Sequence, residues 1–70
     1  MCCTDYKALQ AVILEKGYVQ TRELARATKI NLRQLEEVIS GQAQPSVGLM
    51  YALVDALELS PDRAGTIFFH

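Results

Sequence analysis

Four basic side chains lie close together in one short stretch of the sequence, at a spacing that lets them act on one ligand. Arg22, Arg26 and Lys29 are separated by four and then three positions, so they share one face of a helix. Arg33 extends this group into a small basic stripe. Guanidinium and ammonium groups bind phosphate oxygens, and backbone N–H groups at a helix start near Thr21 can do the same. The stripe therefore predicts a surface that contacts phosphate.

The next segment, NLRQLEEVISG over residues 31–41, combines Arg33 with acidic groups. It has the apolar spacing of a short amphipathic helix, and Arg33, Glu36 and Glu37 fall on its outer face. Phosphate repels carboxylates, so this face suits a nucleic acid only where its acidic groups meet the bases. The alternative is that the glutamates are solvated or contact a protein.

The charge of the whole chain is unlike that of a strongly basic nucleic-acid binder. Its 70 residues have a formal net charge of −1. Residues 1–35 carry a net charge of +3 and residues 36–70 carry −4, so the two halves differ in sign. We expect one face to steer toward an acidic partner. Because the basic groups are few, we also expect weak nonspecific binding with a shallow salt dependence.

Groups suited to catalysis or metal binding are scarce in the sequence. It has no glycine-rich phosphate loop and no carboxylate pair suited to a cleft, and its one histidine is His70. Cys2 and Cys3 are adjacent, an arrangement that rarely forms a disulfide, and with His70 they are too few for a metal site. We expect reduced thiols in a cytoplasmic protein that is not an enzyme and holds no metal or cofactor. The apolar run over 11–14 is too short for a signal peptide or a membrane span.

Helical periodicity places these groups on an all-α framework of five helices without strands, in one domain over residues 1–70. Side chains that can cap a helix precede most of the apolar runs, and glycines follow two of them. The expected caps and stops are Thr4, Asn31, Ser46, Ser60, Gly17 and Gly41. The expected helices cover residues 5–16, 21–29 (opened by Gln20 or Thr21), 31–41, 47–57 and 61–68.

The same spacing identifies the side chains that should face the core. They recur at intervals of three or four positions and are apolar, apart from one threonine. Leu49 and Tyr51 are expected at the margins of their helix. The expected inward positions are Tyr6, Leu9, Val12, Ile13, Leu24, Ala25, Thr28, Leu35, Val38, Ile39, Val47, Met50, Leu53, Val54 and Leu57.

A joint spacing links residues of the two central helices with residues that follow them. These residues are Leu24, Ala25, Ile30, Asn31, Leu35, Val38, Gly41, Pro45, Ser46 and the run 53–60. Two short helices joined by a tight turn, with these residues, resemble the Cro/repressor-type (XRE-like) helix-turn-helix family. The resemblance extends from residue 9 to about residue 67. It implies a compact five-helix, lambda-repressor-like DNA-binding domain, in a transcriptional regulator or repressor of bacterial or phage type.

The resemblance implies that the helix over 31–41 lies in the major groove of double-stranded DNA. Arg33 can fork onto O6 and N7 of guanine, Leu32 can touch a thymine methyl group, and Glu37 can accept from a cytosine amino group. The base-facing residues, carried over by position, are Asn31, Leu32, Arg33 and Glu37. The residues left to contact phosphate are Thr21, Arg22, Arg26 and Lys29.

The sequence departs from the family at two places. Lys29 stands where the family usually has a glycine in left-handed conformation, and a lysine there costs about 1 kcal/mol. Ile13 and Ile39 stand where the family often pairs a buried arginine with a glutamate. Because both positions are apolar together, we expect these two side chains to pack in the core.

Two alternatives stay open. A protein-interaction module could keep this fold and bind DNA weakly or not at all, and the acidic helix over 31–41 with the neutral loop over 42–44 favours it. At the C-terminus, Ile67 and Phe68 could close the core against the first helix. Alternatively, Phe68 and Phe69 could form a homodimer patch.

Overall fold

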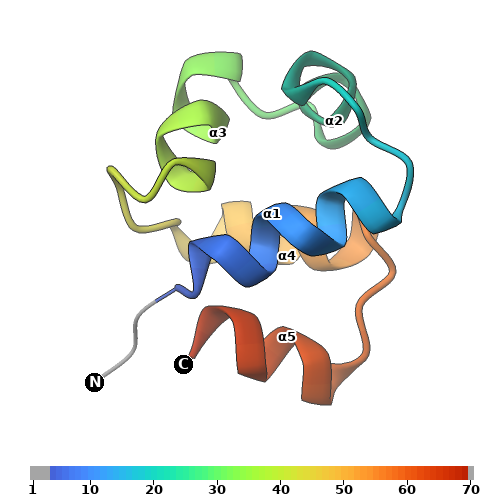
Figure 1. Ribbon diagram of the computed structural model, residues 1–70. Helices are drawn as coiled ribbons and strands as arrows, with labels where there is room; N and C mark the ends of the chain where they lie inside the picture. The colour runs from blue at the N-terminus through green and yellow to red at the C-terminus, as the bar shows by residue number, and fades with distance from the viewer. Residues whose placement is uncertain (1–3, 70) are drawn as a thin grey trace.

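The computed structural model describes residues 4–69, and these form five α-helices (Figure 1). No β-strand occurs in this part of the chain, so the all-α class and the five helices are as predicted. The expectations for Cys2, Cys3 and His70 lie outside the described residues. The helices are α1 (Tyr6–Glu15), α2 (Thr21–Thr28), α3 (Leu32–Ile39), α4 (Val47–Ala56) and α5 (Pro61–Phe68).

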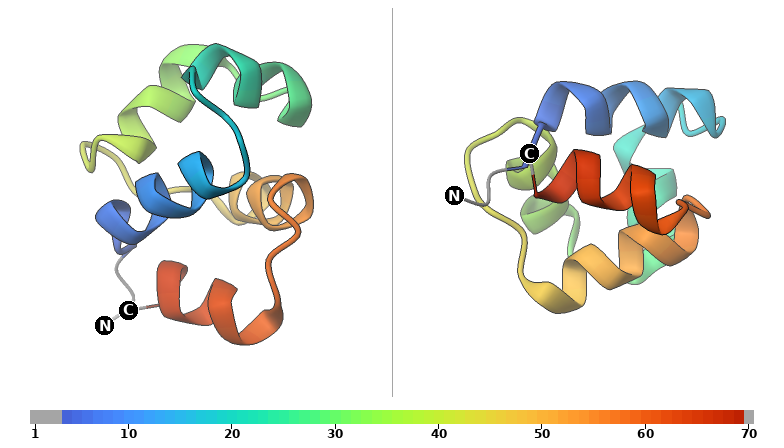
Figure 2. Two further views of the ribbon diagram at one scale, coloured as in Figure 1. Left: turned by 45° about the vertical axis from the view of Figure 1, so that its right-hand side comes forward. Right: turned by 90° about the horizontal axis from the view of Figure 1, so that it is seen from below.

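The five helices form a compact arrangement with three levels. α1 and α4 lie in the middle, α2 and α3 lie together at one end, and α5 lies at the other end (Figure 2). α2 packs against α3 and α4, whereas α1 packs against α3 and α5. The radius of gyration is 10.6 Å. Between residues 4 and 69, no helix has the length and apolar character needed to cross a bilayer.

The start of α1 differs from the prediction that Thr4 caps it. Asp5 is the cap, and its Oδ1 accepts the Ala8 N–H at 3.1 Å. The Asp5 N–H, which has no partner within the helix, donates to the Ile67 carbonyl at 2.7 Å and ties the start of α1 to α5. The Thr4 N–H instead donates to Gln44 Oε1 at 3.4 Å.

The other predicted caps are confirmed. The side chains of Asn31, Ser46 and Ser60 each accept the backbone N–H three positions later, at 3.2 Å. α2 begins at Thr21, and the Glu23 carboxylate accepts the N–H of Gln20 at 3.1 Å. Each cap satisfies an N–H group that the helix itself leaves without a partner, so the helix starts are fixed by local sequence.

A left-handed residue closely follows each of the first four helices. Gly17 and Gly41 have φ of 92° and 83°, as expected for residues that stop a helix. Lys29 has φ of 60°, which confirms the left-handed turn predicted at a non-glycine position. Glu58 has φ of 52°, a left-handed conformation that was not predicted from the sequence. α3 ends at Ile39, two residues before the predicted stop.

The core lies between all five helices, and most of the predicted inward positions are confirmed. α1, α2 and α3 contribute the leucine, valine and isoleucine side chains expected of them, and α5 adds two more. Ile39 and Thr28 are half-buried rather than buried. The buried side chains are Leu9, Val12, Ile13, Leu24, Ala25, Leu35, Val38, Leu49, Leu53, Leu57, Leu59, Ile67 and Phe68.

The prediction for α4 was confirmed at Leu53 and Leu57, which are buried, but was wrong at Val47 and Leu49. Val47 was expected inside but is 62% exposed, whereas Leu49 was expected at the margin and is buried. The buried row runs through Leu49, Leu53 and Leu57, at intervals of four. α4 is apolar on nearly every side, so its periodicity alone does not decide which side faces the core.

The expected pairing of Ile13 with Ile39 is consistent with their placement. Ile13 is buried and Ile39 is half-buried against the core, and both line one small hollow between α1 and α3. In the same hollow, Gln10 Nε2 donates to the Ile39 carbonyl at 2.7 Å. This hydrogen bond satisfies an unpaired carbonyl at the end of α3 and ties that end to α1.

Gly41 combines two constraints, and its replacement by alanine is expected to lower the free energy of unfolding more than the same change at Gly17. Both glycines are left-handed, so each alanine should cost about 1–2 kcal/mol of backbone strain. At Gly41 an added Cβ would also lie 2.9 Å from Cδ1 of Tyr6, whereas nothing lies within 4 Å at Gly17. Urea denaturation of both variants measures the difference.

A matched control separates strain from contact. If the Tyr6 ring causes the extra loss, Gly41→Ala and Gly17→Ala should cost the same in a Tyr6→Ala background. An unchanged difference in that background would contradict the contact explanation. Tyr6 itself was predicted to face the core, yet it is 39% exposed because it lies over this turn at the first position of α1.

A bidentate ion pair joins α1 to α5. Arg63 donates through both terminal nitrogens to the Glu15 carboxylate, at 2.7 and 2.9 Å. Both side chains are about half exposed, so solvent screens the pair. The hydrogen bonds from Arg63 lower the pKa of Glu15 from its ordinary value of 4.5.

Arg63→Gln is expected to raise the pKa of Glu15 toward its ordinary value, as followed by NMR titration of its carboxyl group. A carboxyl whose pKa is lowered by folding favours the folded state above its unfolded pKa. That contribution disappears as the pH falls through the lowered folded pKa. Glu15→Gln should therefore reduce the loss of stability between neutral and acidic pH. An unchanged Glu15 titration in Arg63→Gln would show that the pair does not persist in solution.

Candidate nucleic-acid interface

α2 and α3 are held together by a tight turn that sets the direction of both outer faces. The Lys29 and Ile30 N–H groups both donate to the Ala25 carbonyl, the latter at 3.2 Å. The left-handed Lys29 reverses the chain between the two helices. Ile30 is half-buried and packs against the core, as predicted for a side chain that fills the gap between these helices. The turn thus fixes α3 beside α2.

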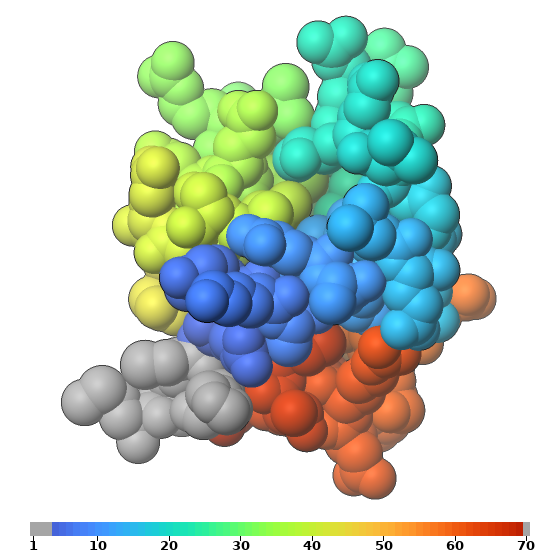
Figure 3. Space-filling model, in the orientation of Figure 1, coloured from blue at the N-terminus to red at the C-terminus, as the bar shows by residue number. Residues whose placement is uncertain are grey.

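The basic stripe is exposed on these two helices. Arg22, Arg26, Lys29 and Arg33 are all exposed. Over residues 4–69 the one ion pair is Glu15–Arg63, so none of these four cations is neutralised by a carboxylate within 4 Å. α2 and α3, which carry three of these side chains, and the turn between them, which carries Lys29, form the end of the molecule away from α5 (Figure 3). The stripe is therefore accessible to a ligand that approaches this end.

Two of the predicted base-facing residues also serve the fold. Asn31 is exposed, but its Oδ1 accepts the Gln34 N–H as the cap of α3, which leaves its amide NH₂ group to donate. Leu32 is half-buried and packs against the core, so only part of its side chain faces outward. Thr21 is half-buried at the first position of α2, where backbone N–H groups lack helical partners.

Arg33 and Glu37 line one shallow hollow of about 370 Å³ on the outer side of α3. Glu36, Ser40 and Gln42 line it with them. The sequence interpretation did not include Ser40 or Gln42 in the site. Gln42 reaches the hollow because the left-handed Gly41 turns the chain back, so that the Gln42 N–H donates to the Glu37 carbonyl at 2.8 Å.

The outer faces of α2 and α3 therefore carry charges of both signs. The stripe has four cations, and Glu23, Glu36 and Glu37 supply three carboxylates, which leaves a net charge of +1. Gln34 adds an exposed amide on α3 that the sequence interpretation also left out, although an amide at this exposed position can bond adenine. The surface is suited to hydrogen bonding more than to long-range attraction of an anion.

Comparisons of the chain with known protein families, with curated proteins and with solved structures found no match.

Proposed function

We propose that the chain is a sequence-specific DNA-binding transcriptional regulator of the Cro/repressor type. In this proposal α2 and α3 form a helix-turn-helix, and α3 lies in the major groove of double-stranded DNA. The observation that carries the proposal is the exposed basic stripe, whose four cations have no carboxylate partner within residues 4–69. Unpaired cations on two adjoining helices are what phosphate contact requires.

Contacts to DNA divide between the two helices. Arg22, Arg26 and Lys29 contact phosphates beside the groove, and the N-terminus of α2 at Thr21 adds backbone N–H groups. Arg33 forks onto a guanine. Phosphate contacts position the protein without reading sequence, so the specificity resides in α3.

One of the two acidic side chains of α3, Glu37, fits this proposal. Glu37 shares a hollow with Arg33, so it is placed to accept from a cytosine amino group next to the base that Arg33 contacts. Glu36 lines the same hollow and lowers the attraction for phosphate. The expected binding is therefore of modest affinity.

A protein-interaction module is the second candidate function. It is favoured by the hollow itself, because two of its five lining residues are glutamates and only Arg33 is basic. A partner that docks there would present cations to Glu36 and Glu37. The DNA proposal requires an excess of positive charge, and the net charge of these outer faces is only +1.

A homodimer through Phe68 and Phe69 was the other predicted partner. Phe68 is buried, as is Ile67, so the expectation that these two side chains close the core is confirmed. Phe69 is 59% exposed and is the one tail aromatic whose ring could contact a second copy. A homodimer through Phe69 stays the alternative that the sequence left open.

Titration of the chain with random-sequence duplex DNA at low salt tests the proposal, followed by selection from a random duplex library. We expect retention that weakens with salt, with a slope no steeper than about −4 because four cations are available. We also expect the selected sequences to share a short motif that contains guanine. No retention at low salt and no enriched motif would leave the protein-interaction module as the function.

A further inference from the structure

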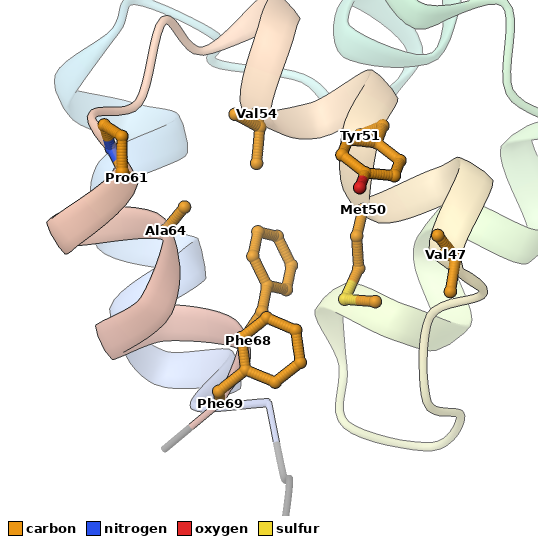
Figure 4. Close-up of a pocket in the computed structure, with 8 residues that line it drawn as sticks. All are labelled: Val47, Met50, Tyr51, Val54, Pro61, Ala64, Phe68 and Phe69. Carbon is orange, nitrogen blue, oxygen red and sulfur yellow. The ribbon is translucent and has the colours of Figure 1, made fainter.

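A second surface lies far from the basic stripe, in a groove of about 440 Å³ between α4 and α5. Val47, Met50 and Val54 from α4 face Ala64 and Phe68 from α5 across it (Figure 4). The complete lining is Val47, Met50, Tyr51, Val54, Pro61, Ala64, Phe68 and Phe69. Apart from the Tyr51 hydroxyl group, every side-chain atom in this lining is carbon or sulfur, so the groove offers apolar contact.

Three of the side chains that line the groove are large, apolar and exposed, and they lie outside the buried core. Val47, Tyr51 and Phe69 are 62%, 72% and 59% exposed. The other exposed large apolar side chains over the described residues are Leu14 at 64%, Val19 at 81% and the less exposed Tyr6 at 39%. The groove stays open because α5 packs against α1, whereas the backbones of α4 and α5 approach each other less closely. Exposed apolar side chains gathered on one groove mark a docking surface.

One end of the groove is acidic. Val54 and Pro61 lie at the end where α4 leads into α5 (Figure 4). Asp55 follows Val54, Asp62 follows Pro61, and Glu58 lies between them, and all three are exposed. The single ion pair found over residues 4–69 joins Arg63 to Glu15, so it does not neutralise these carboxylates. The loop that leads to the other end, residues 42–46, is uncharged.

We propose that this groove binds an amphipathic helix of a partner protein, with basic residues at the end that meets Asp55, Glu58 and Asp62. An apolar groove between helices receives a helix through side chains at intervals of three and four. The α4 side of the lining runs from Val47 to Val54, which corresponds to about 10.5 Å of helix rise. Apolar anchors on two turns of the partner helix span that length.

Charge decides between this occupant and a second copy of the chain. Two copies joined with their grooves parallel would bring the two acidic ends together, and joined antiparallel would place each acidic end against the uncharged end of the other copy. Neither arrangement supplies a cation to the three carboxylates, whereas a basic partner helix does. The groove lies between α4 and α5, whereas α2 and α3 form the end of the molecule away from α5, so a partner helix in the groove leaves the outer faces of α2 and α3 accessible.

The probe is a fluorescent synthetic helix of about 12 residues, long enough for three turns, with leucines on one face and lysines at one end. A matched peptide carries glutamates in place of the lysines. Fluorescence anisotropy should give at least about tenfold tighter binding for the lysine peptide at low salt. Asp55→Asn combined with Asp62→Asn should remove most of that preference. Equal affinity for the two peptides would overturn the proposal.

Two matched variants locate the site. Tyr51→Lys places a charge in the groove at a highly exposed position, and Leu14→Lys does the same on α1, outside the groove. Tyr51→Lys should weaken lysine-peptide binding by more than about tenfold, while Leu14→Lys should leave it unchanged. Circular dichroism verifies that both variants fold. Unchanged binding by a folded Tyr51→Lys would show that the peptide docks elsewhere and would overturn the assignment.

Sedimentation of the chain alone tests the competing occupant. We expect a monomer, because a second copy offers no cation to the acidic end of the groove. A dimer that Tyr51→Lys dissociates would mean that a second copy fills the groove, and the partner-helix proposal would be wrong. DNA retention by Tyr51→Lys should equal that of the unmodified chain, so the two proposed surfaces succeed or fail independently.

Discussion

Leu53→Ala is expected to lower the free energy of unfolding by about 2–5 kcal/mol, the typical range for a buried leucine. Leu53 has no exposed surface and lies in the middle of α4, among the buried side chains of the core. A chain of 70 residues has a total stability of about 4–10 kcal/mol, so this single change removes a large part of it. Thermal denaturation should show a midpoint lowered by more than about 10 °C.

Leu14→Ala is the matched control for this prediction. The chemical change is the same, but Leu14 is 64% exposed on α1, so its removal should alter stability by less than about 0.5 kcal/mol. If Leu14→Ala proved as destabilising as Leu53→Ala, α1 would bury a different face from the one described. If neither variant lost stability, the core would not be the one that the leucines of α4 form.

The helix starts could be predicted from the sequence because short-range chemistry determines them. Asn31, Ser46 and Ser60 cap their helices through N–H groups only three positions away, and no distant residue is involved. At the start of α1, Asp5 is the cap in place of the predicted Thr4, and here a distant residue takes part. The Asp5 N–H is held by the Ile67 carbonyl from the other end of the chain, and a contact over that separation leaves no local signal.

The side of α4 that faces the core could not be predicted, for a related reason. Periodicity identifies a buried face when polar residues occupy the other faces, and α4 has almost none. The helix is apolar all round because it serves two surfaces. Leu49, Leu53 and Leu57 face the core, while Val47 and Tyr51 line the groove with α5. The apolar pattern of α4 therefore did not distinguish the residues that line the groove from those that face the core.

The candidate site was predictable where neighbours in sequence are neighbours on a helix. Arg22, Arg26 and Lys29 are exposed as their spacing indicated. Gln42 was missed because its place beside Arg33 depends on the chain reversal at Gly41. Contacts made by such a reversal depend on backbone geometry, which spacing along the sequence does not describe.

Arg33→Ala is expected to weaken binding to a selected DNA site by about 1–3 kcal/mol and to relax the preference for guanine at one position. Arg33 is exposed on α3 and has no carboxylate within 4 Å over residues 4–69, so its guanidinium N–H groups can donate to a guanine. The loss corresponds to an affinity change of about fivefold to 150-fold. Competition between the selected site and a site with that guanine replaced measures it.

Arg26→Ala supplies the contrast, because both changes remove one guanidinium group from the same surface. A phosphate contact carries no sequence information, so Arg26→Ala should weaken all duplexes alike. It should also reduce the slope of affinity against salt by about one unit. Arg33→Ala should instead lose affinity mainly for the selected site, with a much smaller loss for other duplexes. Equal losses on all sequences for both variants would mean that Arg33 also contacts phosphate and that α3 reads no base through it.

Glu37→Gln completes the series on the acidic side of the hollow. A carboxylate only accepts hydrogen bonds, whereas an amide both donates and accepts, so the preferred base at one position should change. Removing a negative charge near phosphate should at the same time raise the affinity for random duplexes. Selection from the random library with the unmodified chain and all three variants measures both effects. If the unmodified chain enriches no motif and no substitution alters retention, α3 is not a reading helix, and its glutamates belong to a solvated face or to a basic protein partner.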